Sequence, residues 1–270
     1  MTLQHWFSSL IGIVFFLVAA AQDSWKPAGT KIKTDWSEKI AVANPHAEYP
    51  RPQLVRGNWT NLNGLWNYAI QEKTIEAKPA SFDGKILVPF AIESSLSGVG
   101  KTVGKDNLLW YERSFTLPST FKGKKVLLHF GAVDWQCEVF VNDMSVGTHQ
   151  GGYDPFSFDI SKALAKKGNQ RIMVRVWDPT DEGPQPRGKQ VKNPEGIWYT
   201  PVTGIWQTVW LEAVPETYIT GTRQTPDIDA KQVKVETSVA NARAGDQVLI
   251  TAYDGQIKLA EQLTNAGDAV

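Results

Sequence analysis

Short apolar runs with a period of two residues dominate the middle of this sequence and limit its fold more than any other feature. Clear examples are Val126–Phe130 and Ile172–Val176, in which every second residue is apolar and large. Side chains two residues apart lie on the same face of a strand, so these runs are typical of half-buried β-strands. Turn dipeptides such as Asn63-Gly64 and Asp83-Gly84 separate the runs.

The same pattern recurs often enough to define the fold class. We expect strands at Gly64–Ile70, Lys85–Val88, Leu109–Leu117, Lys125–Gly131, Trp135–Val141, Phe156–Ile160, Arg171–Trp177 and Ile205–Glu212. The helical period has one short candidate, Ile160–Lys167. The sequence therefore predicts an all-β fold, with a β-sandwich of the jelly-roll type over residues 49–214.

Pro215 marks the expected start of a second unit over residues 215–270. Two further runs, Val233–Val239 and Val248–Tyr253, predict strands there. An immunoglobulin-like sandwich needs about 100 residues, whereas 215–270 holds 56. We therefore expect an incomplete immunoglobulin-like sandwich and a truncated chain, because a complete protein rarely leaves sheet edges unpaired.

The amino terminus has the pattern of an export signal. An apolar run from Leu10 to Ala21 ends in three alanines, as in a signal peptide with its cleavage site, and it is short for a membrane span. We expect residues 1–21 to be a signal peptide and 22–48 to be an extended leader. The protein would then be periplasmic or extracellular and free of the membrane after cleavage. An uncleaved anchor stays open, because no Lys or Arg precedes the apolar run.

Charge and cysteine usage exclude several functions. Lys and Arg number 28 and Asp and Glu number 28, and no basic run suggests a nucleic-acid partner. Cys137 is the single cysteine and falls in an alternating run, so we interpret it as a buried structural thiol. The four histidines have no metal-ligand spacing, and His129 is expected at the surface. We expect no metal and no cofactor.

The stretch EGIWYTPVTGIWQTVWLE, residues 195–212, concentrates tryptophan. Tryptophan fills cores and interfaces, and it also offers a flat surface for a sugar ring. Trp206 and Trp210 share one face of an expected strand, so we expect them to pack against a neighbouring layer. Trp198 and Tyr199 precede that strand in a loop. They either line a carbohydrate cleft or serve the architecture alone.

Several motifs in a fixed order resemble glycoside hydrolase family 2, the group of β-galactosidases, β-glucuronidases and β-mannosidases. The resemblance is to the amino-terminal sugar-binding jelly roll and, after it, to the start of an immunoglobulin-like domain, over about residues 45–270. Its residues are Pro50–Pro52, Leu62–Trp66, Val88–Ser94, Trp110–Phe115, Val139–Ile160 and Gly196–Glu212.

The resemblance implies a function that this stretch of chain cannot perform alone. In the family, two glutamates of a separate (β/α)₈ barrel hydrolyse the glycosidic bond with retention, and the acid/base glutamate follows an asparagine. None of the eleven asparagines here precedes a glutamate, so we expect no catalytic residue. The expected role is the non-catalytic front of a secreted retaining β-glycosidase. Its partners would be a β-linked glycan and the missing catalytic barrel of the same polypeptide.

Candidate substrate-binding residues follow from the resemblance and from loop chemistry. Some β-galactosidases place an acidic side chain of this domain beside the sugar, and the matching position here is Glu195 or Gly196. Donor-rich loop residues could reach sugar hydroxyls, although solvation alone also explains them. The candidates are Trp198, Tyr199, Glu195, Arg187, Lys189, Gln190, Glu93 and Ser94. Asp178 and Asp181 are expected to stabilise a turn.

Two other classes of function stay open. The jelly roll could be a free-standing carbohydrate-binding module or lectin, which would bind a glycan in isolation through exposed aromatic residues such as Trp198. It could also be a scaffold without a ligand of its own.

Overall fold

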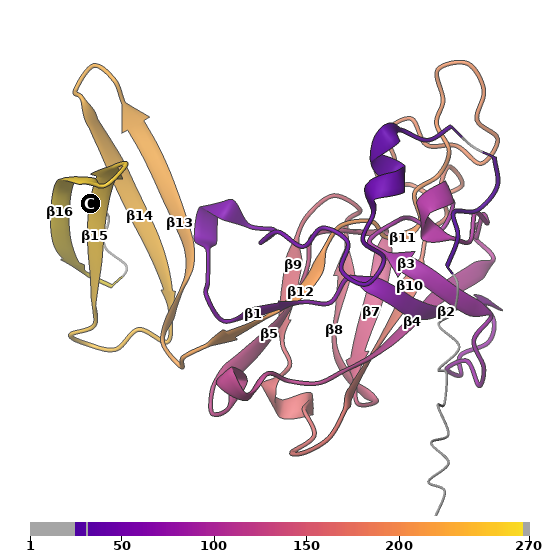
Figure 1. Cartoon of the computed structure of the whole chain (residues 1–270), viewed down its shortest axis with the longest axis horizontal. Coiled ribbons are helices and arrows are strands. Elements are labelled where there is room, and N and C mark those ends of the chain that lie inside the picture. The colour runs from indigo at the N-terminus through magenta and orange to yellow at the C-terminus, as the bar shows by residue number, and fades with distance from the viewer. Residues whose placement is uncertain (1–24, 31, 267–270) are drawn as a thin grey trace, which may run out of the picture.

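The expected strands assemble into two antiparallel sheets in the computed structural model, which describes residues 25–30 and 32–266 (Figure 1). The expected signal peptide and the first residues of the leader lie outside this range. No helix in the described part of the chain is long and apolar enough to cross a membrane.

Ten strands form the two large sheets. The six-stranded sheet has the order β3-β2-β4-β10-β7-β8 and the four-stranded sheet has the order β1-β12-β5-β9. Their bounds are β1 Trp59–Asn61, β2 Gly64–Glu72, β3 Gly84–Val88, β4 Asn107–Phe115, β5 Lys125–Phe130, β7 Gln136–Val141, β8 Met144–Gln150, β9 Phe156–Asp159, β10 Gln170–Trp177 and β12 Val209–Val214. Every paired neighbour in these sheets is antiparallel.

One apolar core fills the space between the sheets. Leu109 and Val174 of the six-stranded sheet are fully buried in the same cluster as Leu128, Phe130 and Leu211 of the four-stranded sheet. Each such side chain stabilises the fold by about 1.5–3 kcal/mol through removal from water. The β-sandwich predicted from the period-two runs is therefore confirmed.

The tryptophan-rich segment is where the strand prediction is wrong. The expected strand Ile205–Glu212 is two strands, β11 Gly204–Ile205 and β12, separated by Trp206–Thr208. The strand β11 pairs with β6, Val133–Asp134, in a small sheet of its own. The buried Asn63 side chain holds the break, because its Oδ1 accepts a hydrogen bond from Val209 N (2.9 Å) and its Nδ2 donates to Thr208 Oγ1 (3.2 Å).

The expected helix at Ile160–Lys167 is also wrong. The segment has only one 3₁₀ turn, η5, Ser161–Ala163. The buried amide of Gln170 takes the place of helical hydrogen bonds, because its Oε1 accepts from Ala165 N (2.7 Å) and its Nε2 donates to Gly168 O (3.1 Å). Gly168 has a positive φ of 83°, which ends any helix there.

The described part of the leader lies against the sandwich. Ala28 N donates to Ser95 O (2.8 Å), and the Ser95 hydroxyl donates back to Ala28 O (2.6 Å). Ser95 begins the 3₁₀ helix η3, Ser95–Ser97. A Cβ on the following Gly98 would lie 2.6 Å from the Trp25 indole nitrogen, so a glycine is needed for this close approach. Two more 3₁₀ helices, η1 Asp35–Lys39 and η2 Pro52–Leu54, precede the first strand, and η4, Ser119–Phe121, follows β4.

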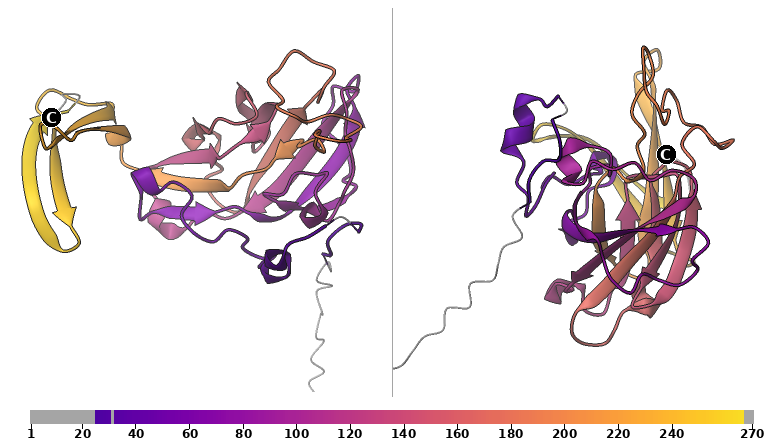
Figure 2. Two further views of the ribbon diagram at one scale, coloured as in Figure 1. Left: turned by 90° about the horizontal axis from the view of Figure 1, so that it is seen from above. Right: turned by 90° about the vertical axis from the view of Figure 1, so that its right-hand side faces the viewer.

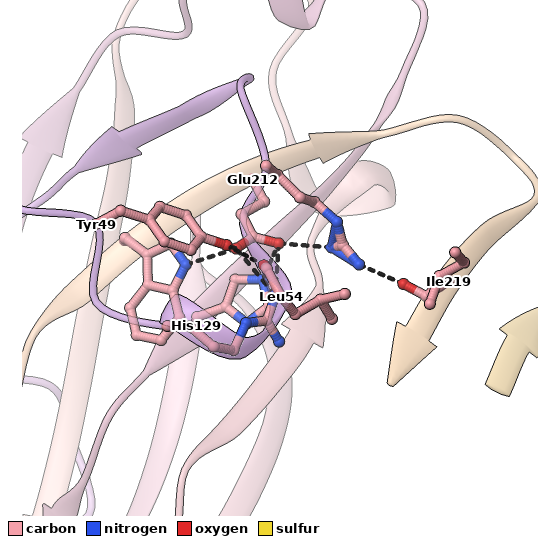
Figure 3. Close-up of polar contacts among 8 residues, drawn as sticks. Tyr49, Leu54, His129, Glu212 and Ile219 are labelled. Carbon is pink, nitrogen blue, oxygen red and sulfur yellow. Dashed lines mark hydrogen bonds and ion pairs between the residues drawn. The ribbon is translucent and has the colours of Figure 1, made fainter. Parts of the chain in front are cut away.

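Glu212 is the centre of a buried polar cluster on the outer side of β12 (Figure 3). Its carboxylate accepts hydrogen bonds from Tyr49 Oη (2.5 Å), Arg51 Nη2 (2.9 Å) and Arg56 Nη1 (2.7 Å), and from Trp210 Nε1 (2.9 Å). Arg56 also donates to Ile219 O in the strand that leaves the sandwich. The cluster therefore joins the segment 49–56, the four-stranded sheet and the chain that follows it.

The same cluster corrects the expectation that His129 lies at the surface. His129 is buried, stacks on the Trp210 ring with centroids 4.8 Å apart, and places its Nε2 3.3 Å from Glu212 Oε2. Burial lowers the pKa of His129. Burial alone would raise the pKa of Glu212, but the hydrogen bonds from His129, Tyr49 and Trp210 outweigh it and bring the pKa to about 2. As expected, Trp210 packs against a covering layer.

Four strands follow the sandwich and pair as two separate hairpins. Their bounds are β13 Tyr218–Asp227, β14 Gln232–Ala240, β15 Gln247–Asp254 and β16 Ile257–Asn265. The strand β13 pairs only with β14, and β15 only with β16, in two-stranded sheets. Figures 1 and 2 show both hairpins to one side of the sandwich, where β12 leads into β13. The two strands expected in residues 215–270 are therefore present.

Candidate functional site

The long loop between β10 and β11, residues 178–203, rises from one end of the sandwich (Figure 2). Its two arms run side by side, because Tyr199 N donates to Lys189 O (2.9 Å) and Val191 N donates to Tyr199 O (3.1 Å). The Gln190 side chain fixes the loop to the sandwich. Its Oε1 accepts from Val202 N (2.6 Å), and its Nε2 donates to Asp134 Oδ2 (3.2 Å) and contacts the Tyr153 hydroxyl (3.3 Å).

Three buried carboxylates lie beneath this loop: Glu93, Asp134 and Asp178. Thr203, also buried, connects two of them, since its backbone N donates to Glu93 Oε2 (2.9 Å) and its hydroxyl donates to Asp178 Oδ2 (2.7 Å). Asp178 Oδ1 accepts from Thr180 N (2.7 Å), which is the turn expected for this residue. The three carboxylates come from parts of the chain far apart in sequence.

Burial changes the protonation of this group. It raises the pKa of Glu93 to about 7, although hydrogen bonds from Thr203 partly oppose the shift. The pKa of Asp134 also rises to about 7, through burial and then through the charge of Asp178. Burial raises the pKa of Asp178 as well. Carboxylates that crowd together in a dry environment hold protons near neutral pH, so Glu93 and Asp134 are partly protonated there.

Aromatic side chains flank a hollow of about 660 Å³ next to the loop. Tyr153 and Trp206 meet edge to face, with ring centroids 6.2 Å apart, and Trp206 Nε1 donates to Gly152 O (2.7 Å). Residue 152 must be glycine, because a Cβ there would lie 2.5 Å from Asp134 Oδ1. Another part of the lining comes from the chain before β1, namely His46 and residues 48–53. Aromatic walls with a few polar groups are the usual lining of a site for a small ligand.

The structure places the predicted site residues in two groups. Trp198 and Tyr199 are exposed near the loop tip, with 42% and 64% of their surface accessible, and Glu195 is exposed beside them. Lys189 lies near the Tyr199 ring, 5.9 Å from its centroid. These four side chains face solvent and are free to meet a ligand or another domain.

The remaining candidates have partners within the fold. Gln190 and Glu93 belong to the polar group beneath the loop. Arg187 Nη1 donates to Asp181 O (3.2 Å) and so stabilises the loop. The Ser94 hydroxyl caps η3 by accepting a hydrogen bond from Ser97 N (3.2 Å).

Sequence reasoning missed Asp134 as part of this site. The residue is buried at the end of β6 and contacts the loop through Gln190. One signal was available, the glycine pair Gly151-Gly152, because the second glycine makes room for the Asp134 carboxylate. Among the described residues, no group of three or more His, Cys, Asp or Glu side chains could hold a metal ion. The chemistry that the arrangement offers is stacking and hydrogen bonding.

Comparison with known proteins first defines the class. Residues 100–215 match the family model "Glycosyl hydrolases family 2, sugar binding domain". A β-galactosidase of Thermoanaerobacter pseudethanolicus is 33% identical over 165 residues, which cover 59% of this chain and 21% of that protein. A β-glucuronidase of Sus scrofa is 26% identical over 245 residues, which cover 79% of this chain and 36% of that protein.

A solved structure has the same fold. The β-glucuronidase of Ruminococcus gnavus in complex with D-glucuronic acid superposes with a TM-score of 0.61 at 22% identity, over 82% of this chain and 40% of that chain. Residues 100–215 of the present chain are thus similar to the sugar-binding domain of glycoside hydrolase family 2, the family that the motifs resemble. It spans between about a fifth and two fifths of the length of these three relatives.

Proposed function

We propose that this chain is the non-catalytic front of an exported family 2 glycosidase that hydrolyses β-linked glycosides. The observation that carries the proposal is the family match over residues 100–215. It is supported by relatives named β-galactosidase and β-glucuronidase, of which the chain spans less than half. The two names differ in the sugar, and the side chains that choose between the sugars would belong to a catalytic barrel.

The role of the sandwich in that enzyme is to support the barrel and to shape the entrance to the sugar pocket. The exposed pair Trp198 and Tyr199 lies on the loop arm that pairs with Gln190, whose side chain fixes the loop to the sandwich. Exposed aromatic side chains on a fixed part of a loop suit a site that must meet a sugar at a defined place. The hollow beside Tyr153 and Trp206 gives the same end of the sandwich a second aromatic wall.

Two measurements test the proposal. Sequencing of the gene beyond codon 270 should show a frame that continues into a (β/α)₈ barrel with an Asn-Glu pair. The purified chain should not hydrolyse 4-nitrophenyl β-D-glucuronide or 4-nitrophenyl β-D-galactoside. Turnover of either substrate by pure protein would refute the non-catalytic role. A stop codon after Val270 would refute the proposal that this chain is the front of a longer enzyme.

A free-standing carbohydrate-binding module is the second candidate, and the exposure of Trp198 and Tyr199 favours it. A module of this kind would bind a neutral β-linked glycan in isolation, with loss of binding in Trp198→Ala. The enzyme front requires the barrel to complete its site and would bind the same glycan only weakly.

A further inference from the structure

The outer face of the six-stranded sheet carries a hollow that the site at the loop does not include. It has a volume of about 340 Å³, within the range of small-ligand sites. Its walls come from the ends of β4, β7, β8 and β10 and from Lys73, which follows β2. We call it the Trp177 hollow, after the indole of its largest wall. Its lining residues include Lys73, Leu108, Gln136, Glu138, Thr148, Arg175 and Trp177.

The strand register places these side chains in two adjacent rows. Gln136 lies opposite Trp177 across the β7–β10 pair. In the next outward-facing row, Glu138 lies between Arg175 and Thr148. Because every second residue of a strand points to the same face, these side chains all point away from the core, in which Cys137 and Val176 are buried.

The charged side chains that line the hollow leave one positive charge without a carboxylate partner. Arg175 Nη2 donates to Glu138 Oε2 (2.7 Å), and Ser145 Oγ donates to Glu138 Oε1 (2.7 Å), so Glu138 is fully engaged. The Lys73 ammonium instead lies over the Trp177 ring, 3.4 Å from its centroid. No carboxylate in the described part of the chain forms an ion pair with it. A cation held on an aromatic face keeps donors for an anion.

The indole itself is fixed. Trp177 Nε1 donates to Lys105 O (2.7 Å), which sets the orientation of the ring, and the ring packs in an outer apolar cluster with Leu108, Trp110 and Met173. A rigid aromatic wall with amide, hydroxyl and guanidinium groups on neighbouring strands suits a pyranose, which has apolar C–H groups and several hydroxyls.

We propose that the Trp177 hollow binds an acidic saccharide, namely a uronic acid residue of an oligosaccharide. Its carboxylate pairs with Lys73, which the Trp177 ring holds in place, and its hydroxyls meet Gln136, Thr148 and Arg175. This second sugar site goes beyond the proposed function, because it shares no residue with the loop or with the aromatic hollow near Tyr153. It would hold an acidic polysaccharide on the outer face of the six-stranded sheet.

Isothermal titration calorimetry on the full chain tests the proposal with trigalacturonic acid and, as the matched neutral probe, its trimethyl ester. The acid should bind, and the ester should bind about tenfold more weakly or not at all, because it cannot form the charge-assisted hydrogen bond to Lys73. Lys73→Met should weaken binding of the acid about tenfold, and Trp177→Ala should abolish it. Lys85→Met, which removes an exposed cation of the same sheet outside the hollow, should change nothing.

Several outcomes would overturn this site. Equal binding of acid and ester would remove the role of Lys73. Loss of binding in Trp198→Ala, but not in Lys73→Met, would place the saccharide at the loop. Sodium acetate or sodium sulfate could also compete with the acid at an equal concentration of anionic groups. That result would show a general anion site and not a saccharide site. Lys73 is exposed, so its variant keeps the test valid even if Trp177→Ala does not fold.

Discussion

The sandwich and the two hairpins after it are made of similar strands but differ in what those strands bury. In the sandwich, β12 is buried at all six positions, because the core covers one face and the segment 49–56 covers the other. In the hairpin β15–β16, Leu249 and Leu263 pair across the strands yet keep 59% and 56% of their surface exposed. Antiparallel pairing extends along the strands in both regions, with one register shift in each hairpin and one between β7 and β8 of the sandwich.

The difference shows that pairing alone does not make a core. An isolated two-stranded hairpin is marginally stable in water, and a further layer is needed for independent stability. The four-stranded sheet has two such layers, the six-stranded sheet and the polar cluster around Glu212. Among the described residues, neither of these two layers covers the hairpin β15–β16. The following predictions test this contrast, from the largest expected effect to the smallest.

The core of the sandwich should carry the largest cost. Phe130 is fully buried and stacks on Phe156, with ring centroids 5.0 Å apart. Phe130→Ala should lower the free energy of unfolding by about 3–5 kcal/mol, because it leaves a cavity in a close-packed interior. Urea denaturation followed by tryptophan fluorescence would measure the change. A loss below about 1 kcal/mol would mean that the sandwich is no better packed than the hairpins.

The Glu212 cluster should come next. Glu212→Gln removes a buried charge that several donors share, and should cost about 2–4 kcal/mol of stability, since the arginines lose their buried partner. A matched control is Glu216→Gln, which removes an exposed partner of Lys125 (3.1 Å) and should cost about 0–1 kcal/mol. Equal losses of stability in the two variants would contradict the idea that this cluster holds the segment 49–56 against β12.

The pH dependence of stability in Glu212→Gln and Glu216→Gln gives a second test of the same idea. The pKa of Glu212 is lowered to about 2 in the folded protein, from an ordinary value of 4.5. A lowered pKa contributes stability above the ordinary value, and that stability is lost as the pH falls from about 4.5 toward about 2. Chemical unfolding at a series of acidic pH values should show this loss in the parent protein and in Glu216→Gln. It should be reduced in Glu212→Gln.

The carboxylates beneath the loop should behave in the opposite way. The pKa of Asp134 is raised from 3.8 to about 7, so the folded state binds protons that the unfolded state has released. Stability should therefore fall as the pH rises from about 4 to about 7. Asp134→Asn should stabilise the protein by about 1–2 kcal/mol at pH 8, because the neutral amide avoids the buried charge and can still accept from Gln190.

Thermal unfolding of this variant at pH 5 and pH 8 would measure the effect. Asp227→Asn is a suitable control, because Asp227 is exposed at the end of β13. A destabilised Asp134→Asn at pH 8 would show that the ionised carboxylate is needed to hold the loop.

A hairpin substitution should have the smallest effect. Leu263→Ala should change the free energy of unfolding by no more than about 0.5 kcal/mol, because the side chain is more than half exposed. Urea denaturation, compared with Phe130→Ala, would measure it. A loss above about 1.5 kcal/mol would break the contrast, since it would mean that another layer covers this face in solution.

Local sequence predicted the strands well and the buried polar groups poorly. The period-two runs of β5 and β10 reflect one face against the core, which is a local property of the chain. His129 occupies the other face of β5, and the pattern alone assigns that face to water. His129 is buried because Tyr49 and Arg51, more than seventy residues earlier in sequence, bind Glu212 beside it. Such a partner cannot be read from the neighbours of His129.

In the candidate site too, local sequence predicts some residues, whereas others depend on partners distant in sequence. Trp198 and Tyr199 could be placed in an exposed loop from glycine and proline around them. The burial of Glu93 depends on Thr203, 110 positions later in sequence, and the break between β11 and β12 depends on Asn63, 146 positions before Val209. Each of these is one side chain that satisfies a distant backbone group. Residue patterns contain no record of that pairing.

The wide spacing of the Glu212 donors has a consequence for synthesis. Tyr49, Arg51 and Arg56 lie 163, 161 and 156 positions from the carboxylate that they bind. A ribosome that builds the chain from its amino end releases all three long before Glu212 emerges. We expect the nascent amino-terminal segment to stay undocked, and to be open to proteases and chaperones, until the whole sandwich has been translated. The sandwich can therefore complete its fold only after its last strand, β12, has been translated.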